Sequence, residues 1–239
     1  MGFISYFVLF ASVLISGLLG LRLKNINAQW LKLLLAFSGA YLFALCVLHL
    51  IPETYSSDST HIGLFILAGF ILQLLLEFFS EGIEHGHVHV HKTHKHAFPF
   101  AMIFSLSLHS FLEGMPLGEP GAGGTVQNSL LTGIILHHVP VAIALATMLT
   151  ASNVKVHITM ISVLLFAAMA PLGALISFLL GENKTWFLYQ YYPQIMALVI
   201  GIFLHISTTI LFESTEDHRF NYYRFIAILA GVGSALLIL

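Results

Sequence analysis

The chain has 239 residues, of which 58% are hydrophobic and only 8% are Asp, Glu, Lys or Arg. Globular chains carry about 25% charged residues, so a soluble fold of this size could not cover its surface, which excludes a cytosolic enzyme. Nine Lys and Arg residues exclude the basic surface of a nucleic-acid-binding protein, and the single cysteine, Cys46, excludes a disulfide framework or a cysteine-based zinc module. An integral membrane protein remains, and it contains 14 histidines.

Apolar runs follow one another along the chain, each close to the roughly 20 residues that a transmembrane helix needs. None alternates as a transmembrane strand would. The first run has no Lys or Arg before it, so we interpret it as a retained span and not as a cleaved signal peptide. We predict an all-α integral membrane protein, a single transmembrane domain over 1–239 built as an eight-helix bundle. Its spans are expected at about 3–21, 33–52, 61–82, 97–118, 126–150, 156–181, 187–212 and 221–239.

The distribution of Lys and Arg predicts the orientation, because these residues accumulate in cytoplasmic loops. If the N-terminus faces outside, eight of the nine Lys and Arg residues fall in inner loops and only Lys184 falls outside. We therefore expect both termini outside the membrane and the segment at about 83–96 in the cytoplasm.

Ionisable residues occur about half-way along two of the predicted spans. A charged side chain at the bilayer centre costs about 2.5–3.5 kcal/mol, so such residues are expected to have a function. His109 and Glu113 share one face of span four, being four residues apart, and His137 and His138 lie at a similar depth in span five. A hydrogen bond between helices would explain a lone histidine equally well, but four such side chains at one depth predict a cation site. Imidazole and carboxylate suit Zn²⁺, Fe²⁺ or Mn²⁺ better than Cu⁺.

Three segments resemble signatures of one family, the ZIP (ZRT/IRT-like) divalent-metal transporters. HSFLEG at 109–114 resembles the family's H-N/S-x-x-E-G signature, and HHVP at 137–140 resembles its H-N-x-P-E-G signature. HLIPE at 49–53 is similar to its H-L-x-P-E signature. Eight spans, external termini and a His-rich cytoplasmic loop after span three also match, so the resemblance covers the whole chain. It implies a transporter that works by alternating access.

The resemblance also implies roles for individual residues. His109, Glu113 and His137 would be metal ligands. Ser110 and His138 stand where many members of the family have asparagine, at what would be the second metal position.

One departure from the family pattern concerns the carboxylate that follows the proline in span five. Val141 and Ala142 stand where the family has glutamate and glycine. Because a valine offers no oxygen ligand, we expect one metal ion at the centre of the membrane and not two.

Polar residues near the ends of two other spans are candidates for the transport pathway. Two lie at the outer end of span two, where a cation would enter, and two lie in the inner half and at the inner end of span seven. A helix-end cap and a solvated carboxylate are the alternatives for the two acids. The four residues are His49, Glu53, His205 and Glu213. On span three, Gln73 and Glu77 are either pathway groups or interhelical hydrogen-bonding groups.

The predicted cytoplasmic loop contains six of the 14 histidines. A His-rich tract is typical of weak, exchangeable metal binding, and the alternative is a solvated loop of accidental composition. We expect the loop to be dispensable for transport itself. Its histidines are His85, His87, His89, His91, His94 and His96.

Taken together, these patterns predict an importer of a divalent metal, with Zn²⁺ as the first expectation and Fe²⁺, Mn²⁺ or Cd²⁺ as alternatives. The metal would be the substrate, and no cofactor is implied. The competing hypothesis is a membrane-embedded zinc-dependent hydrolase, which would need three ligands, an open position and a nearby acid or base. A second acid near the centre and an H-E-x-x-H motif are both missing from the sequence. The expected surroundings are a lipid bilayer, in the plasma membrane of a bacterium, and a homodimer is compatible with the sequence.

Overall fold

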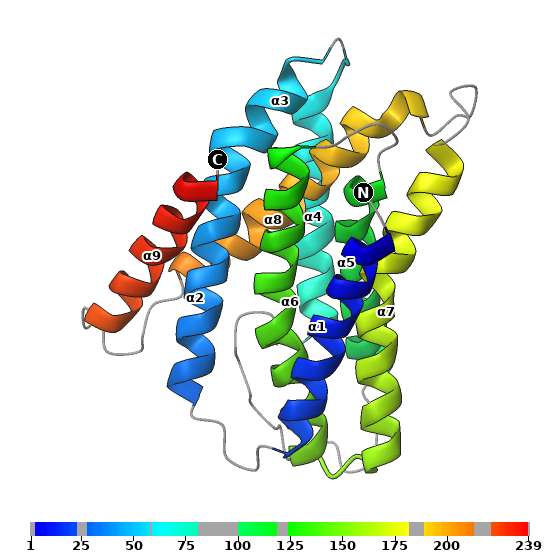
Figure 1. Cartoon of the computed structure of the whole chain (residues 1–239), viewed down its shortest axis with the longest axis vertical. Helices are drawn as coiled ribbons and strands as arrows, with labels where there is room; N and C mark the ends of the chain where they lie inside the picture. The colour runs from blue at the N-terminus through cyan, green and yellow to red at the C-terminus, as the bar shows by residue number, and fades with distance from the viewer. Residues whose placement is uncertain are drawn as a thin grey trace.

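The computed structural model describes residues 3–22, 28–57, 59–80, 100–118, 124–181, 189–212 and 221–238 (Figure 1). Within these ranges every regular element is a helix, and seven of the helices are long and apolar enough to cross a membrane. The prediction of an all-α membrane bundle is confirmed.

The helices follow the predicted spans in chain order. The principal helices are α1 (Phe3–Arg22), α2 (Ala28–Leu45), α4 (Ile62–Ser80), α5 (Phe100–Gly114), α6 (Thr125–Ala151), α7 (Val156–Gly181), α8 (Tyr192–Phe212) and α9 (Tyr222–Ile238). Short elements extend three of them: η1 (Cys46–Leu50) and α3 (Ile51–Tyr55) continue α2, η3 (Met115–Gly118) continues α5, and η4 (Tyr189–Tyr191) precedes α8.

One span extends clearly beyond its predicted bounds of about 33–52. The second runs as one apolar helix from Ala28 to Tyr55, and it passes through the π-helical turn at Cys46–Leu50 just before Pro52. The last, α9, lies close to its predicted bounds but has only 17 residues, whereas each of the seven candidate spans, counted with the short elements that extend them, has at least 19. Both described chain ends lie in the upper half of Figure 1, and the side of the membrane that they face stays a prediction.

The helices pack in two groups. In one group α1 packs along α6 and α7, and α5 packs along α7; in the other α4 packs along α8, and α2 packs along α9 and α8. Figure 1 shows α9 and α2 on one side of the molecule and α1 and α7 on the other. Contacts of α2 with α6 and of α4 with α5 join the two groups. The central histidines therefore lie where the groups meet.

Glycines allow the closest helix contacts within each group. A Cβ atom on Gly69 of α4 would lie 1.9 Å from the carbonyl oxygen of Leu198, and one on Gly201 of α8 would lie 2.0 Å from that of Ile66. Gly114 of α5 faces a carbonyl oxygen of α7 equally closely. Small residues at such interfaces let the backbones of membrane helices touch, so the relative depth of α4 and α8 is fixed.

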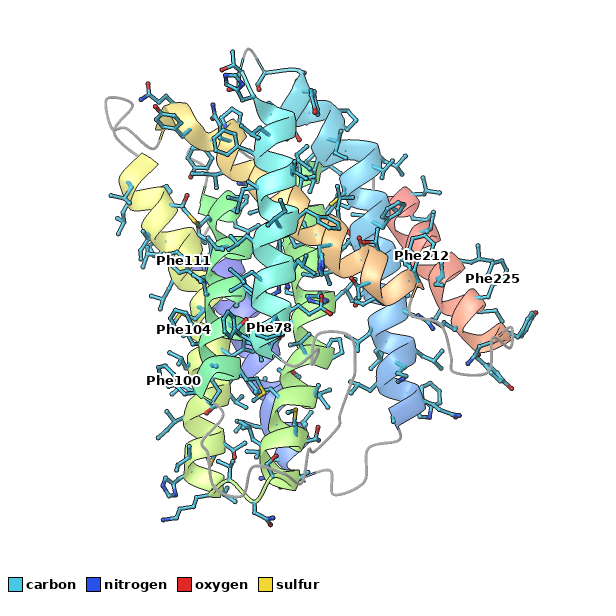
Figure 2. All side chains as sticks on the ribbon, turned by 180° about the vertical axis from the view of Figure 1, so that it is seen from behind. Phe78, Phe100, Phe104, Phe111, Phe212 and Phe225 are labelled. Carbon is cyan, nitrogen blue, oxygen red and sulfur yellow. The ribbon has the colours of Figure 1, made fainter. Side chains whose placement is uncertain are left out.

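Large apolar side chains cover the outside of the bundle. Figure 2 shows several of the phenylalanines that it labels pointing away from the helices. Because polar side chains such as His109 and Glu113 are instead fully buried, the molecule has an apolar exterior around a polar centre, as a lipid environment requires. The labelled phenylalanines with exposed side chains are Phe78, Phe100, Phe104, Phe212 and Phe225.

Candidate metal centre

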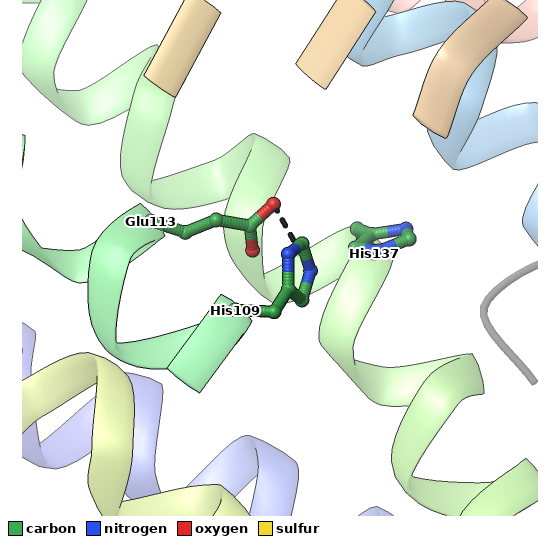
Figure 3. Close-up of side chains that lie close together, drawn as sticks. All are labelled: His109, Glu113 and His137. Carbon is green, nitrogen blue, oxygen red and sulfur yellow. Dashed lines mark ion pairs between the residues drawn. The ribbon is translucent and has the colours of Figure 1, made fainter. Parts of the chain in front are cut away.

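Helix α5 supplies a histidine and an acid to the centre of the bundle. His109 and Glu113 are one turn apart, so both side chains leave the helix on the same face, and neither is exposed. The distance from His109 Nε2 to Glu113 Oε1 is 3.3 Å (Figure 3). After Glu113 the helix tightens into the η3 turn at Met115–Gly118, which contains Pro116.

Helix α6 supplies two further histidines from its middle. His137 and His138 are buried, and their ring centroids are 6.0 Å and 6.2 Å from that of His109. His138 Nε2 lies 2.6 Å from Glu113 Oε2, whereas His109 Nε2 pairs with the other carboxylate oxygen, Oε1. The four residues His109, Glu113, His137 and His138 are called the central cluster below.

Three members of the central cluster have the separations of a candidate metal site. One ligand atom each from His109, Glu113 and His137 lies within 4.8 Å of the others, and all three side chains are buried. Ligands of one tetrahedral Zn²⁺ lie about 3.4 Å apart, given bond lengths of about 2.0–2.2 Å. The most widely separated of these atoms would therefore need to approach by up to about 1.4 Å around an ion, which side-chain rotation can supply. Their chemistry, two imidazoles and a carboxylate, fits Zn²⁺, Fe²⁺ or Mn²⁺.

His138 and Ser110 occupy different positions beside these three residues. His138 binds the second oxygen of Glu113, and its Nδ1 has no hydrogen-bond partner among the described residues. The Ser110 hydroxyl donates to the carbonyl of Phe166 on α7 at 3.3 Å. A role in metal binding stays a prediction for both residues.

The position next to the cluster on α6 is apolar. Val141 is fully buried one turn beyond His137. No oxygen ligand is therefore available from this side chain.

A glutamine from a third helix reaches the cluster. Gln73 of α4 is fully buried, and its Oε1 lies 3.0 Å from Nδ1 of His109. The sequence analysis gave two alternatives for Gln73, a pathway group or an interhelical hydrogen-bonding group. The structure shows the interhelical hydrogen bond. A polar residue half-way along an apolar span was the signal, but its partner could not be inferred from the pattern.

A second histidine–acid pair lies one helical turn from Gln73. Glu77 follows Gln73 on α4, one turn nearer to segment 81–99. Its Oε2 atom lies 3.4 Å from Nε2 of His205 on α8. His205 is buried, with its ring against that of Phe70, whereas Glu77 is partly exposed. Glu77 and His205 are called the inner pair below, after the inner position that the sequence predicts for His205. Both belong to the helix group that lacks the central cluster.

The remaining predicted pathway residues are spread out. His49 is half-buried in η1, a π-helical turn, and such turns are frequent at functional sites. Glu53 is exposed on α3, one turn further along the same continuous helix. Glu213 and the six histidines at 85–96 lie outside the described residues.

The fold and the cluster define a class of protein: a multi-pass membrane helix bundle with a buried group of histidines and a glutamate at its centre. Comparison with known proteins gives the family. The model of the ZIP zinc transporter family matches residues 98–239, which is more than half of the chain, so the protein belongs to that family. The family transports divalent metals, and its members are transporters and not enzymes, which decides against the hydrolase hypothesis.

Two curated relatives are similar over different shares of the chain. Zinc transporter ZIP1 of Mus musculus is 26% identical over 246 aligned residues, covering 84% of this chain and 75% of the relative. Protein zntD of Dictyostelium discoideum is 25% identical over 153 residues, covering 59% of this chain. The match spans only 22% of the length of zntD.

Proposed function

We propose that this protein carries Zn²⁺ across a plasma membrane into the cytoplasm, with the central cluster as its main binding site. The observation that carries the proposal is the convergence of His109, Glu113 and His137, all buried, within 4.8 Å. Buried acids and histidines in membrane helices are costly and mark ion pathways. The name of the mouse relative, a zinc transporter, supports zinc among the metals that this donor set fits.

In this proposal His109, Glu113 and His137 are the primary ligands, and His138 is a fourth. His138 would reach the ion by exchanging its hydrogen bond with Glu113 Oε2 for a bond to the metal. Four ligands of this kind complete the tetrahedral geometry that zinc prefers. Ser110 would contribute only if a second ion were bound.

The charge of the cluster supports a single ion. Glu113 is its one acid, so one divalent ion leaves the cluster at +1, and two would leave it at +3 if the imidazoles are neutral. Two unit charges 4 Å apart repel by about 4 kcal/mol at an effective dielectric constant of 20, and two divalent ions about four times as strongly. Val141 supplies no oxygen to offset that repulsion.

The pathway would pass through the cluster from one face of the membrane to the other. His49 and Glu53 would receive the ion outside, and the inner pair would accept it from the cluster on the cytoplasmic side. Support comes from Gln73 and Glu77, which lie on one face of α4, one beside the cluster and the other in the inner pair. Glu213 and the histidines at 85–96 would then be the last groups that the ion meets.

Alternating access would arise from movement between the two helix groups. The cluster lies on α5 and α6, in one group, while the inner pair lies on α4 and α8, in the other. Sliding or rocking of one group against the other would open the cluster first to one side and then to the other.

Zinc uptake by proteoliposomes containing an internal zinc indicator tests the proposal. We expect saturable uptake that His109→Ala and His137→Ala each reduce to the level of empty vesicles. His157→Ala is the matched control, because His157 is an exposed histidine at the start of α7. Wild-type rates in the two cluster variants would overturn the site assignment. Competition by Fe²⁺, Mn²⁺ and Cd²⁺ would rank the metals. Preference for another metal would overturn the assignment of zinc as the substrate but not the assignment of the site.

A further inference from the structure

We propose that Gln73 is a positioning residue that keeps His109 in the tautomer with the proton on Nδ1, and so turns the lone pair of Nε2 toward the metal position. The inference rests on the proposed function in one respect, that His109 is a metal ligand. No motif of the sequence assigned this role to Gln73, because the residue lies 36 positions from its partner.

The hydrogen-bonding chemistry of the two groups determines the tautomer. Gln73 presents Oε1 to His109 Nδ1 at 3.0 Å, and an amide oxygen can only accept. Nδ1 must therefore carry the proton, and in a neutral imidazole the other nitrogen then has the lone pair.

The other edge of the ring faces the metal position. His109 Nε2 lies 3.3 Å from Glu113 Oε1, longer than the 2.7–2.9 Å or so of a charge-assisted hydrogen bond. Glu113 instead makes its short contact, 2.6 Å, with His138. The His109 ring is thus anchored through Nδ1 on α4, while Nε2 points at the carboxylate with which it would share an ion.

Gln73 itself is held in place by the packing of α4. Gly69, one turn earlier on α4, meets the backbone of α8 with no room for a Cβ atom. On the other side, the Ser105 hydroxyl of α5 donates to the carbonyl of Leu76 on α4 at 2.5 Å. Two hydrogen bonds therefore join α4 to α5 at neighbouring turns, and only one of them involves a residue of the central cluster.

The amide also suits the charge of the cluster. Ligating histidines commonly donate their second N–H to an acceptor, and loss of such an acceptor costs about 10–100-fold in metal affinity or activity. A carboxylate at this position would add a second anion to the centre, whereas glutamine accepts the same hydrogen bond without charge. Gln73 is not a further ligand of the same ion in this arrangement, because its oxygen is on the Nδ1 edge of the ring and the ion would be on the Nε2 edge.

The direct test is nitrogen NMR of the purified full-length chain with ¹⁵N-labelled histidine, recorded without metal. Loss of a signal in His109→Gln identifies the ring nitrogens of His109. We expect Nδ1 to be the protonated nitrogen in the wild type and in Gln73→Glu, because a carboxylate also accepts. We expect a mixture of tautomers in Gln73→Leu. A wild-type ring protonated on Nε2, or an unchanged tautomer in Gln73→Leu, would overturn the proposal.

Zinc uptake supplies the functional readout. Gln73→Leu should raise the KM about 10–100-fold with Vmax within about twofold, and Gln73→Glu should bring the KM back toward the wild-type value. Ser105→Ala is the matched control, because it removes the other hydrogen bond between α4 and α5 and should leave the KM within about twofold. Equal KM increases in Gln73→Leu, Gln73→Glu and Ser105→Ala would show a packing role instead. If wild-type vesicles take up no metal, the proposed function fails, while the tautomer measurement still decides the role of Gln73.

Discussion

The central cluster and the inner pair contain the same chemistry, histidine with glutamate, in two different settings. The cluster brings together four buried side chains, none more than 1% exposed, from two helices of one group. The inner pair has two side chains, one of them partly exposed, on two helices of the other group. A conducting pathway needs sites that bind well enough to admit an ion and weakly enough to release it. In the proposed pathway, this difference would suit the cluster to selection and the inner pair to release.

Removal of the acid of the central cluster should have the largest effect. Glu113→Gln keeps the size of the side chain but leaves the ion without a negative ligand. Breaking a buried charge pair costs about 3–5 kcal/mol, which corresponds to at least a 100-fold loss of zinc affinity. Isothermal titration of the protein with zinc measures this affinity. A loss of affinity below about fivefold would contradict the role of Glu113 as a ligand. The thermal unfolding temperature of the metal-free variant checks that the bundle is intact.

The packing of α4, which carries Gln73 and Glu77, connects the two regions. Gly69→Ala places a methyl group 1.9 Å from the Leu198 carbonyl oxygen, so α4 must shift along α8. Overpacking of this kind costs about 1–3 kcal/mol, which should appear as a lower midpoint of thermal unfolding. Gly233→Ala is the matched control, because a Cβ atom on Gly233 meets no atom within 4 Å. Equal stability of the two variants would show that α4 has freedom to move.

Disruption of the inner pair should slow release while leaving binding intact. In His205→Ala we expect Vmax for zinc uptake to fall about five- to tenfold, with a KM within about twofold of the wild type. Glu77→Gln should act in the same direction. A rise in KM with unchanged Vmax would place His205 at the binding step and remove the contrast between the two regions.

The smallest effect, a change in stoichiometry, concerns the apolar side of the cluster. Val141→Glu adds one negative charge next to His137, which would offset part of the repulsion between two divalent ions. We expect bound zinc per chain, measured by elemental analysis after desalting, to rise from about one toward two. Val141→Gln is the matched control without the charge. Two ions already bound in the wild type would contradict the single-ion proposal.

The sequence by itself determined the membrane class, the order of the helices and the residues at the centre. Hydrophobic run length specifies a membrane helix because an apolar span of about 20 residues has no better environment than lipid. The pairing of His109 with Glu113 followed in the same way, since residues four apart on a helix share a face. Each of these inferences depends on one helix at a time.

Only the tertiary structure decided how the helices combine. It placed His138 on the second oxygen of Glu113, Gln73 on the Nδ1 edge of His109 and Glu77 beside His205. Each contact joins side chains of different helices, so it depends on the rotation and depth of one helix against its neighbour. Those two quantities are set by close contacts such as Gly69 against the α8 backbone, where the absence of a side chain decides the geometry. A hydrophobic pattern describes how apolar a helix face is, but it contains no information about the depth at which that face meets another helix.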